Sequence, residues 1–539
     1  MQILRDLMDR QHEHGWLDDA TLRDVAAAHN VPLYRIEGLV SFYPHFRRTP
    51  PPSGMVQVCR DVACRMAAGP SACERLKQAL ADRMDVEVHP VSCLGQCDSA
   101  PAVAVNEQPL EGNSLRDVDA VLEALDQLPS VANAFAAPVG CFSCDPYQSE
   151  QERYGTVRRL VAEHRGDRMA WLHACTQPLQ SAGLRGMGGA GFPTGRKWEM
   201  VGRESSDTQF DICNADESEP GTFKDRVILE QLPQQVVEGM LLAGLAIGAR
   251  RGIVYLRHEY VTPRACLQRA IDSARKQGLL GPNAAGSGWD FDIEIFISPG
   301  GYILGEETAL LQALEDQRGE PRNKPPYPGQ HGLWGQPTLI NNVETFTLAT
   351  AIIHHGADWW AAQGVDGYRG LKFVCISGDV VDPGVYEVPM GTRLSDLIDL
   401  AGGMRDDLPL QAFLPGGAST GFLPADKADT PLDFDALKQA GSALGTGALV
   451  VFNNQRDLFD LAINLIEFFR NESCGKCVPC RVGSQRAVEL LQAVQSGKTA
   501  EEQLSLLPVL GETLEQTSIC GLGQVALSPI LSLRKNLPR

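Results

Sequence analysis

Hydrophobic residues occur along the chain in two patterns: short runs rich in β-branched residues, and longer stretches with apolar positions three or four apart. The short runs predict strands and the longer stretches predict helices. Strands are expected at 55–59, 86–91, 102–106, 210–213, 252–256 and 291–297. Helices are expected at 18–30, 71–83, 117–127, 169–184, 233–247, 262–277 and 394–401. This mixture predicts a multidomain α/β protein.

Proline- and glycine-rich stretches divide the pattern into units. The chain of 539 residues exceeds the size at which one hydrophobic core stops growing, so several domains are expected. Residues 49–54 contain three consecutive prolines and have the composition of a linker. The expected units are a helical lead-in at 1–50, a small α/β domain at 51–130, a linker at 131–152, a large α/β domain at 153–365, a compact α+β domain at 366–440 and a helical region at 441–539.

The charge and the apolar content limit the classes of partner. The formal net charge of -19 argues against nucleic acid or an anionic membrane surface as the main partner. The longest apolar stretch, 240–249, is far shorter than the about 20 residues that cross a bilayer. Residues 1–10 lack the apolar segment of a signal peptide. We therefore expect a cytoplasmic protein with no membrane span, able to attach to other subunits.

Four cysteines near the C-terminus have the spacing of cluster ligands. Cys474, Cys477 and Cys480 are separated by two residues each, and 39 residues separate Cys480 from Cys520. Three thiolates on one loop with a distant fourth suit a [4Fe–4S] cluster. Zinc also accepts four cysteines, although its motifs usually consist of two pairs, and buried free thiols are the remaining interpretation.

Two further pairs, Cys59-x₄-Cys64 and Cys93-x₃-Cys97, each follow a predicted strand. Two such loops at a sheet edge supply four thiolates, enough for a [2Fe–2S] cluster, with structural zinc as the alternative. Cys141 and Cys144 have the spacing of a redox pair or of half a metal site, but no partner pair remains for them, which favours an incidental or weakly structural role.

The segment 183–198 is the most glycine-rich part of the chain. It contains a formal G-x-G-x-x-G at Gly186, Gly188 and Gly191, but a predicted helix rather than a strand precedes it, which excludes an ordinary dinucleotide fingerprint. Glycines still allow the backbone to approach a flat ring or a phosphate closely, and Lys197 adds a positive charge. A flexible surface loop is the alternative.

Three other segments have the composition of ligand-binding loops. Residues 214–221 place polar side chains after a predicted strand, where they can hydrogen-bond a ribityl chain or a ribose, although a solvated acidic turn is the alternative. Residues 300–308 combine glycines with two carboxylates that open a helix. In 340–345 the adjacent amides of Asn341 and Asn342 suit a polar ring edge or a phosphate.

Taken in chain order, these motifs resemble a known family. Residues 150–539 are similar to the 51-kDa FMN subunit of respiratory complex I, and residues 1–130 are similar to its 24-kDa [2Fe–2S] subunit. The segments that carry the likeness are 38–43 and the two N-terminal cysteine pairs, then 183–198, 214–225, 301–308, 324–328, 340–345 and 472–481. A fusion of both subunits looks like the β (diaphorase) subunit of cytoplasmic, NAD-dependent, molybdenum- or tungsten-containing formate dehydrogenases. Related modules serve soluble NAD-reducing hydrogenases.

The resemblance implies a fold of N-terminal helices, a thioredoxin-like [2Fe–2S] domain, a Rossmann-like FMN domain, a β-grasp (soluble-ligand-binding-like) domain and a C-terminal helical bundle with the [4Fe–4S] cluster. The implied cofactors are FMN, NAD, [2Fe–2S] and [4Fe–4S]. The chain departs from the family at Met187, where arginine is frequent, and at Leu304, where cysteine is frequent. Neither departure removes a cluster ligand.

The resemblance also implies roles for individual residues. Lys197, Asn341 and Asn342 fall at the FMN phosphate region. The residues expected along the flavin are Asn214, Asp216, Glu217 and Ser218. Those expected at the nicotinamide nucleotide are Phe192, Glu219, Tyr302, Glu307 and Lys324. The other expected members of the cofactor site are Gly186, Gly188, Gly189, Gly305 and Glu306.

The implied chemistry is hydride exchange between NAD(H) and FMN and single-electron transfer to the clusters, which needs no catalytic side chain. We expect electrons to come from formate that is oxidised in a molybdenum- or tungsten-containing α subunit with iron–sulfur clusters. Small accessory subunits are further expected partners. One alternative is a diaphorase subunit of an NAD-reducing hydrogenase or a complex I-like NADH dehydrogenase. Another is a non-enzymatic scaffold with zinc-filled Cys₄ sites.

Overall fold

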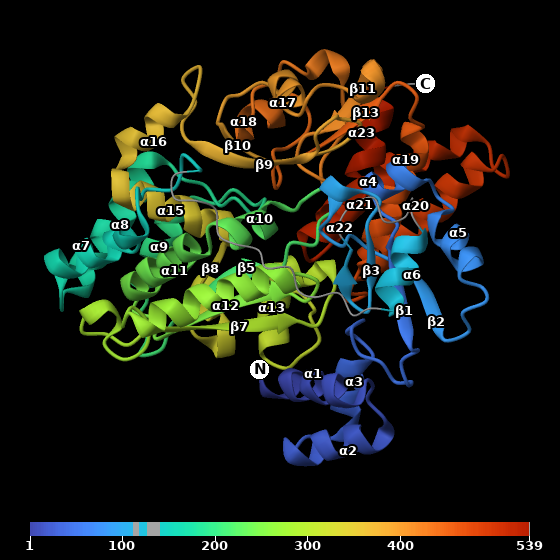
Figure 1. The fold of residues 1–539 in the computed structure, drawn as a ribbon. Coiled ribbons are helices and arrows are strands. Elements are labelled where there is room, and N and C mark those ends of the chain that lie inside the picture. Colours follow the sequence, from blue (N-terminus) through green and yellow to red (C-terminus); the bar gives the residue numbers. More distant parts are fainter. Residues whose placement is uncertain (111–117, 127–140, 538–539) are drawn as a thin grey trace.

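The computed structural model describes residues 1–110, 118–126 and 141–537, and its elements form five regions in chain order (Figure 1). The lead-in helices are α1 (Gln2–His14), α2 (Asp19–Ala28) and α3 (Leu33–Val40). They lie at the lower edge of the molecule in Figure 1, below the central domain. The Tyr43 hydroxyl, just after α3, anchors them by donating to the Gln317 carbonyl of that domain at 2.5 Å.

The N-terminal sheet domain follows the lead-in helices. Its strands are β1 (Gly54–Cys59), β2 (Val86–Val91), β3 (Val103–Val105) and β4 (Gln108–Pro109), in the order β2-β1-β3-β4. Strand β1 is parallel to β2 and antiparallel to β3. Its helices are α4 (Val62–Ala68), α5 (Ala72–Ala79) and α6 (Val118–Asp126). The hydrophobic pattern predicts all of these except β4 and α4, because so short an element shows no clear period.

Parts of two predictions lie outside the described residues: both ends of the helix expected at 117–127, and residues 131–140 of the linker expected at 131–152. The remainder of the linker, from residue 141, packs onto the central domain. There the Tyr147 hydroxyl donates to both carboxylate oxygens of the buried Glu238, at 2.8 and 2.7 Å.

The central domain is built on four parallel strands, β5 (Phe210–Ala215), β6 (Arg251–Arg257), β7 (Asp292–Ser298) and β8 (Thr338–Asn342), in the order β7-β6-β5-β8. Its helices are α7 (Gly155–His164), α8 (Arg168–Ala182), α9 (Thr194–Gly202), α10 (Lys224–Gln231), α11 (Pro233–Ile247), α12 (Val261–Lys276), α13 (Glu307–Leu314), α14 (Pro328–His331), α15 (Val343–His355) and α16 (Ala357–Gln363). The three strands predicted here and the predicted helix at 233–247 are all present.

Both faces of this sheet are covered, and the inner strand β6 is accordingly a continuous apolar run over 252–256, whereas the edge strand β7 alternates. Ile212 and Ile253 belong to the buried cluster that contains α13. Cys213 and Val254 belong to the cluster that contains α11 and α15 on the other face. The core therefore holds the strand ends rigidly on both sides, and those ends carry the polar residues discussed below.

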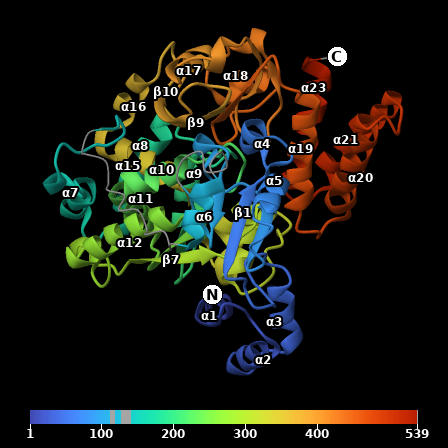
Figure 2. The same cartoon turned by 45° about the vertical axis from the view of Figure 1, so that its right-hand side comes forward.

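A second sheet domain and a helical bundle complete the chain (Figure 2). The second sheet domain has β9 (Leu371–Gly378), β10 (Gly384–Pro389), β11 (Leu410–Leu414), β12 (Leu423–Pro424) and β13 (Ala448–Asn453), in the order β10-β9-β13-β11-β12, with α17 (Leu394–Leu400) and α18 (Phe434–Gln439). The C-terminal bundle has α19 (Leu458–Asn471), α20 (Val478–Gln495), α21 (Leu507–Thr517), α22 (Gly521–Val525) and α23 (Ser528–Asn536). Within the described ranges, every helix is too short or too polar to cross a membrane.

Candidate functional site

The carboxyl ends of the four parallel strands meet at one edge of the central sheet, and the strand order reverses between β5 and β8. In open parallel sheets, ligands bind in the crevice outside such a reversal. Asn214 of β5 pairs in register with Asn342 of β8, so the fold brings these two predicted residues to the crevice. The Asn214 side chain also donates to the Gly305 carbonyl at 2.8 Å, which ties the 300–308 segment to the same edge.

The glycine-rich loop 183–193 packs against this edge. It folds back on itself, since the Gly186 N–H donates to the Phe192 carbonyl at 2.8 Å. A Cβ added at Gly188 would lie 3.0 Å from the Cβ of Asn342, so a glycine is needed for this close approach. Helix α8 precedes the loop, which confirms that the motif is not the strand-to-helix turn of an ordinary dinucleotide fingerprint.

The two adjacent asparagines are engaged by protein groups. Asn342 Oδ1 accepts from Lys224 Nζ at 3.1 Å, and its Nδ2 donates to Asp225 Oδ2 at 2.5 Å. Asn341 Oδ1 accepts from the indole N–H of Trp198 at 3.1 Å. Their amides therefore fix the wall of the crevice, a role that the sequence pattern did not predict.

An ionic cluster of two lysines and two glutamates lies beside β8. Lys197 Nζ donates to the Ile340 carbonyl at 2.8 Å and lies 4.0 Å from Glu307. Lys324 Nζ lies 2.7 Å from Glu307 and 2.8 Å from Glu306. Burial lowers the pKa of Lys197, whereas the two lysines lower the pKa of Glu307 despite its burial. Lys197, predicted for the flavin phosphate, thus forms one cluster with Glu307 and Lys324, two of the residues predicted for the nicotinamide nucleotide. Both lysines of this cluster are already paired with carboxylates.

The acidic loop after β5 sends its side chains in different directions. Asp216 accepts from the Ser218 hydroxyl at 3.1 Å, and burial raises the pKa of Asp216 to about 7. Glu217 turns inward and accepts from the first backbone N–H groups of α10 at 2.9 and 3.2 Å, which makes it a helix cap. Glu219 crosses to the second sheet domain and accepts from the Ser419 N–H at 2.8 Å.

The predicted aromatic residues have different surroundings. Phe192 is 42% exposed on the glycine-rich loop. Tyr302 packs its ring against Phe468 of α19, with ring centroids 4.9 Å apart. Just before it, Gly301 has a φ of 116° and open space where a side chain would stand. A flat ligand therefore has room above this glycine.

The four N-terminal cysteines come together and are all buried. The sulfurs of Cys93 and Cys97 lie 3.4 Å apart. Hydrogen bonds with the Cys64 and Cys93 thiols, followed by burial, raise the pKa of Cys59 well above its usual value. Cys59 is the last residue of β1, Cys64 lies on α4 and Cys97 begins a short 3-10 helix, so of the four predicted loop placements only that of Cys93 holds.

Backbone amides point at these sulfurs. The N–H groups of Gly95, Ala102 and Gly221 donate to cysteine sulfurs at 3.4, 3.3 and 3.4 Å respectively. Such donors stabilise the negative charge of a bound iron–sulfur cluster. Gly221 belongs to the acidic loop of the central domain, so this set of thiols is enclosed by two domains.

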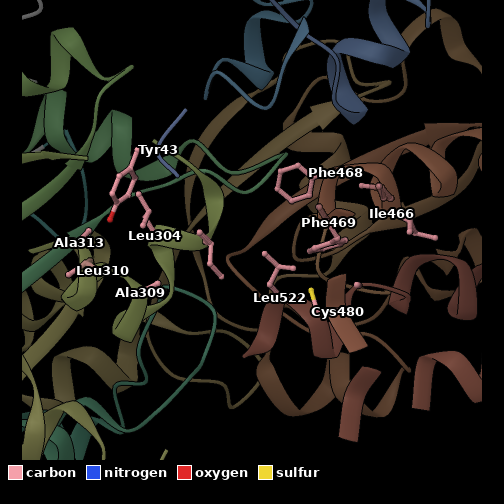
Figure 3. Close-up of a cluster of buried hydrophobic side chains, with 14 of the residues drawn as sticks. Tyr43, Leu304, Ala309, Leu310, Ala313, Ile466, Phe468, Phe469, Cys480 and Leu522 are labelled. Atoms are coloured by element: carbon pink, nitrogen blue, oxygen red, sulfur yellow. The ribbon is translucent and has the colours of Figure 1, made fainter. Parts of the chain in front are cut away.

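Three of the four C-terminal cysteines lie at helix starts, and Cys474 lies on the loop before α20. Cys477 is the residue before α20, Cys480 lies in its first turn, and Cys520 is the residue before α22. A Cβ added at Gly523 of α22 would lie 3.0 Å from the Cβ of Cys480, so the two helices approach closely. Figure 3 shows Cys480 beside Leu522 at this contact. Burial raises the pKa of Cys480 to about 11 and that of Cys520 to about 12.

Both sets have the donor chemistry of clusters. Among the described residues, no three His, Cys, Asp or Glu side chains are arranged around a single ion. In a cluster the cysteines bind different irons and need not surround one centre. Of the remaining predictions, Cys144 is buried and Cys141 is exposed, and the departures Met187 and Leu304 are both buried.

Sequence reasoning missed several residues that join domains at this site. Arg257 at the end of β6 donates to the Cys93 carbonyl at 2.7 Å. Glu472 accepts from the Tyr302 N–H at 2.8 Å and from the Ser92 hydroxyl at 2.5 Å. All three contacts join residues more than 160 positions apart, so local patterns carry no signal for them.

Four family models match the chain. Residues 1–126 match the thioredoxin-like [2Fe–2S] ferredoxin, and residues 179–350 match the Nuo51 FMN-binding domain. Residues 373–423 match the SLBB domain, and residues 460–539 match the NADH-ubiquinone oxidoreductase-F iron-sulfur binding region. These matches confirm the expected fold class and the expected cofactors FMN, NAD, [2Fe–2S] and [4Fe–4S].

The chain is similar to proteins of two kinds. It is 34% identical to the NAD-reducing hydrogenase HoxS subunit alpha of Cupriavidus necator, over 100% of this chain and 91% of that protein. It is 44% identical to one of the subunits of the NADH-quinone oxidoreductase of Escherichia coli, over 63% of this chain and 75% of that protein. A solved NAD+-reducing [NiFe]-hydrogenase in the H2-reduced state matches with a TM-score of 0.86 and 33% identity, over 99% of this chain and 92% of that chain.

Proposed function

Because the chain belongs to the family of NAD-linked diaphorase subunits that join a thioredoxin-like [2Fe–2S] domain to an FMN-binding domain and a [4Fe–4S] region, we propose that it connects NAD(H) to a partner subunit by electron transfer. Bound FMN would exchange a hydride with the nicotinamide and single electrons with the clusters. The residues of the chain bind and orient these groups.

One observation carries the proposal: both cysteine-bearing segments contact loops that leave the carboxyl edge of the central sheet, the N-terminal one through a cysteine sulfur and the C-terminal one through Glu472. Gly221 donates its N–H to the Cys97 sulfur at 3.4 Å. Glu472, two residues before Cys474, accepts from the Tyr302 N–H at 2.8 Å. A flavin and a nicotinamide bound at this edge would therefore lie close to both sets.

We assign the ligand roles as follows. The [2Fe–2S] ligands are Cys59, Cys64, Cys93 and Cys97, and the [4Fe–4S] ligands are Cys474, Cys477, Cys480 and Cys520. The glycine-rich loop, packed closely on Asn342, offers its backbone to the flavin. The ionic cluster around Lys197 and Lys324 holds the phosphates, and the loop 300–308 holds the nicotinamide nucleotide. The protein functions in the cytoplasm, where thiols stay reduced until a cluster is inserted.

The partner is a hydrogen-oxidising subunit. Two similarities support this proposal: a relative that matches over the whole chain and a solved structure with a TM-score of 0.86 are both named as NAD-reducing hydrogenases. The formate dehydrogenase partner expected from the fused architecture has less support, because that architecture is shared with the hydrogenase relative.

Two measurements test the proposal. The chain, reconstituted anaerobically with iron, sulfide and FMN, should show flavin and iron–sulfur absorption and reduce ferricyanide with NADH. A colourless, iron-free product would contradict the diaphorase function. The native complex should then reduce NAD+ with H2 and contain nickel, whereas formate-dependent reduction with molybdenum or tungsten would favour the formate partner instead.

A further inference from the structure

One face of α19 runs along the boundary between the C-terminal bundle and the N-terminal sheet domain. Asp460, Asn464, Phe468 and Glu472 are spaced four residues apart and therefore share this face. Asp460 pairs with Arg65 through two hydrogen bonds of 2.9 and 2.7 Å. All four residues make contacts outside the bundle, so this face is a docking face rather than a solvated one.

The contacts along the face lead to the candidate nicotinamide site. Asn464 donates to the backbone carbonyl of Arg60, next to Cys59, at 3.1 Å. One turn further, Phe468 packs on the Tyr302 ring at 4.9 Å. Figure 3 shows Phe468 and Phe469 side by side on this helix. The face thus begins at the N-terminal sheet domain and ends at the loop 300–308.

Glu472 closes the face with a bridge. One carboxylate oxygen accepts from the Tyr302 N–H at 2.8 Å, and the other accepts from the Ser92 hydroxyl, next to Cys93, at 2.5 Å. Charge-assisted hydrogen bonds of this kind are stronger than neutral ones. The bridged loop contains Gly300 and Gly301, both with positive φ, so without an anchor its backbone has wide conformational freedom.

We propose that Glu472 is a positioning residue for nicotinamide binding: its carboxylate holds the Tyr302 backbone, and with it the loop 300–305, at a fixed place against the [2Fe–2S] loop. This inference rests on the proposed function, because it assumes that loop 300–308 binds the nicotinamide nucleotide. It adds a residue from the [4Fe–4S] segment to that site, through the backbone of Tyr302 rather than through contact with the ligand.

The test compares Glu472→Ala with wild type in the reconstituted holoprotein. The Tyr302 amide should exchange with deuterium faster in Glu472→Ala, as measured by mass spectrometry on peptides covering 299–306. NADH should bind about tenfold more weakly, while the maximal ferricyanide rate should change by less than about twofold. Glu472→Gln keeps an acceptor oxygen for the amide and should restore both the protection and the affinity.

Two further variants separate positioning from stability. Asp460→Ala breaks a contact on the same face of α19, about 18 Å away along the helix, and should leave amide exchange and NADH affinity unchanged. Ser92→Ala removes only the second arm of the bridge and should weaken NADH binding about twofold to threefold. If Glu472→Ala does not fold, Ser92→Ala alone tests the positioning role of Glu472.

The outcomes are distinct. The positioning role would be overturned if Glu472→Ala showed the amide exchange and the NADH affinity of wild type. If Glu472→Ala fails to fold, unchanged NADH affinity in Ser92→Ala would overturn it. Equal loss of NADH affinity in Asp460→Ala and Glu472→Ala would also overturn it, because that result indicates general loosening of the interface. If wild type itself binds neither FMN nor NADH, the proposed function fails instead.

Discussion

The two sets of cysteines differ in how the protein surrounds them. The N-terminal set is buried, and an amide from a second domain, that of Gly221, donates to one of its sulfurs. In the C-terminal set only Cys480 is buried, and the neighbouring Val478 and Val482 on α20 are 59% and 46% exposed. One set is thus enclosed by domain packing, and the other lies near an apolar part of the surface.

This difference separates two roles for clusters in one chain. A partner subunit reaches only what lies near the surface, so under the proposed function the C-terminal set is the one that we expect to exchange electrons with a partner. The enclosed set is shielded from a partner and lies beside the acidic loop of the candidate site. The buried Arg257, which donates to the Cys93 carbonyl, places a positive charge beside this set.

The largest effect is expected for Cys477→Ser at the half-exposed set. Loss of one ligand should reduce NADH-dependent reduction of the partner's clusters by more than about 100-fold, while FMN content and NADH:ferricyanide activity remain. Stopped-flow absorbance of the complex measures this. Cys141→Ser, an exposed cysteine outside both sets, is the matched control. Unchanged electron transfer to the partner's clusters in Cys477→Ser would show that the C-terminal set does not pass electrons to the partner.

Arg257→Ala probes the enclosed set. Arg257 is 2% exposed, donates to the Cys93 carbonyl at 2.7 Å and pairs with Glu259 at 2.8 Å. Removing it takes the donor away from the buried carbonyls of Cys93 and Glu217 and leaves the partly exposed Glu259 with only His258. We therefore expect a loss of about 2–4 kcal/mol in the unfolding free energy of the first transition.

Urea unfolding monitored by circular dichroism measures the loss in Arg257→Ala. Arg486→Ala, which breaks an exposed pair with Glu489, should leave the midpoint unchanged. Similar losses in the two variants would contradict the picture of an enclosed, charge-stabilised set.

The local features of both regions can be predicted from the sequence, because spacing along the chain reports them. The C-x₂-C-x₂-C motif and the polar ends of β5 and β8 are local patterns, and the fold brings the two polar strand ends together at one edge of the sheet. Enclosure is not local. It depends on contacts such as that of Arg257 with the Cys93 carbonyl, between residues 164 positions apart.

The direction of a side chain also escapes local patterns. Glu217 lies in the predicted acidic loop, yet it caps α10 instead of facing the crevice. Asn342 is at the predicted position, yet its amide binds Asp225 within the protein. Both outcomes depend on which buried donors the tertiary fold places nearby, and a donor of that kind has no sequence signature.

Glu219→Gln tests the region between the two sets. In the wild type, Glu219 accepts from the Ser419 N–H at 2.8 Å, and the amide oxygen of the variant can still do so. The contact between the domains should therefore survive the loss of charge. We expect NADH affinity to fall about tenfold with FMN content unchanged, as measured by flavin fluorescence and equilibrium titration. Equal losses of FMN and NADH would contradict the separate roles assigned along this loop.

The smallest effect concerns pH. Burial raises the pKa of Asp216 to about 7, above its usual value of 3.8, so the folded state binds this proton more tightly than the unfolded state does. The resulting stabilisation is complete below about pH 4 and is lost as pH rises to about 7.

Asp216→Asn keeps a neutral group at every pH. The unfolding free energy of the variant relative to wild type should therefore rise by about 1 kcal/mol between about pH 5 and about pH 8. This value is smaller than the full cost of a buried charge because water can enter the site. Urea midpoints at the two pH values measure this change. The exposed Asp366→Asn variant is the control and should show none. A flat difference for Asp216→Asn would mean that Asp216 is already ionised at the lower pH. The acidic loop beside the enclosed cysteines would then be as well solvated as the surface around the C-terminal set.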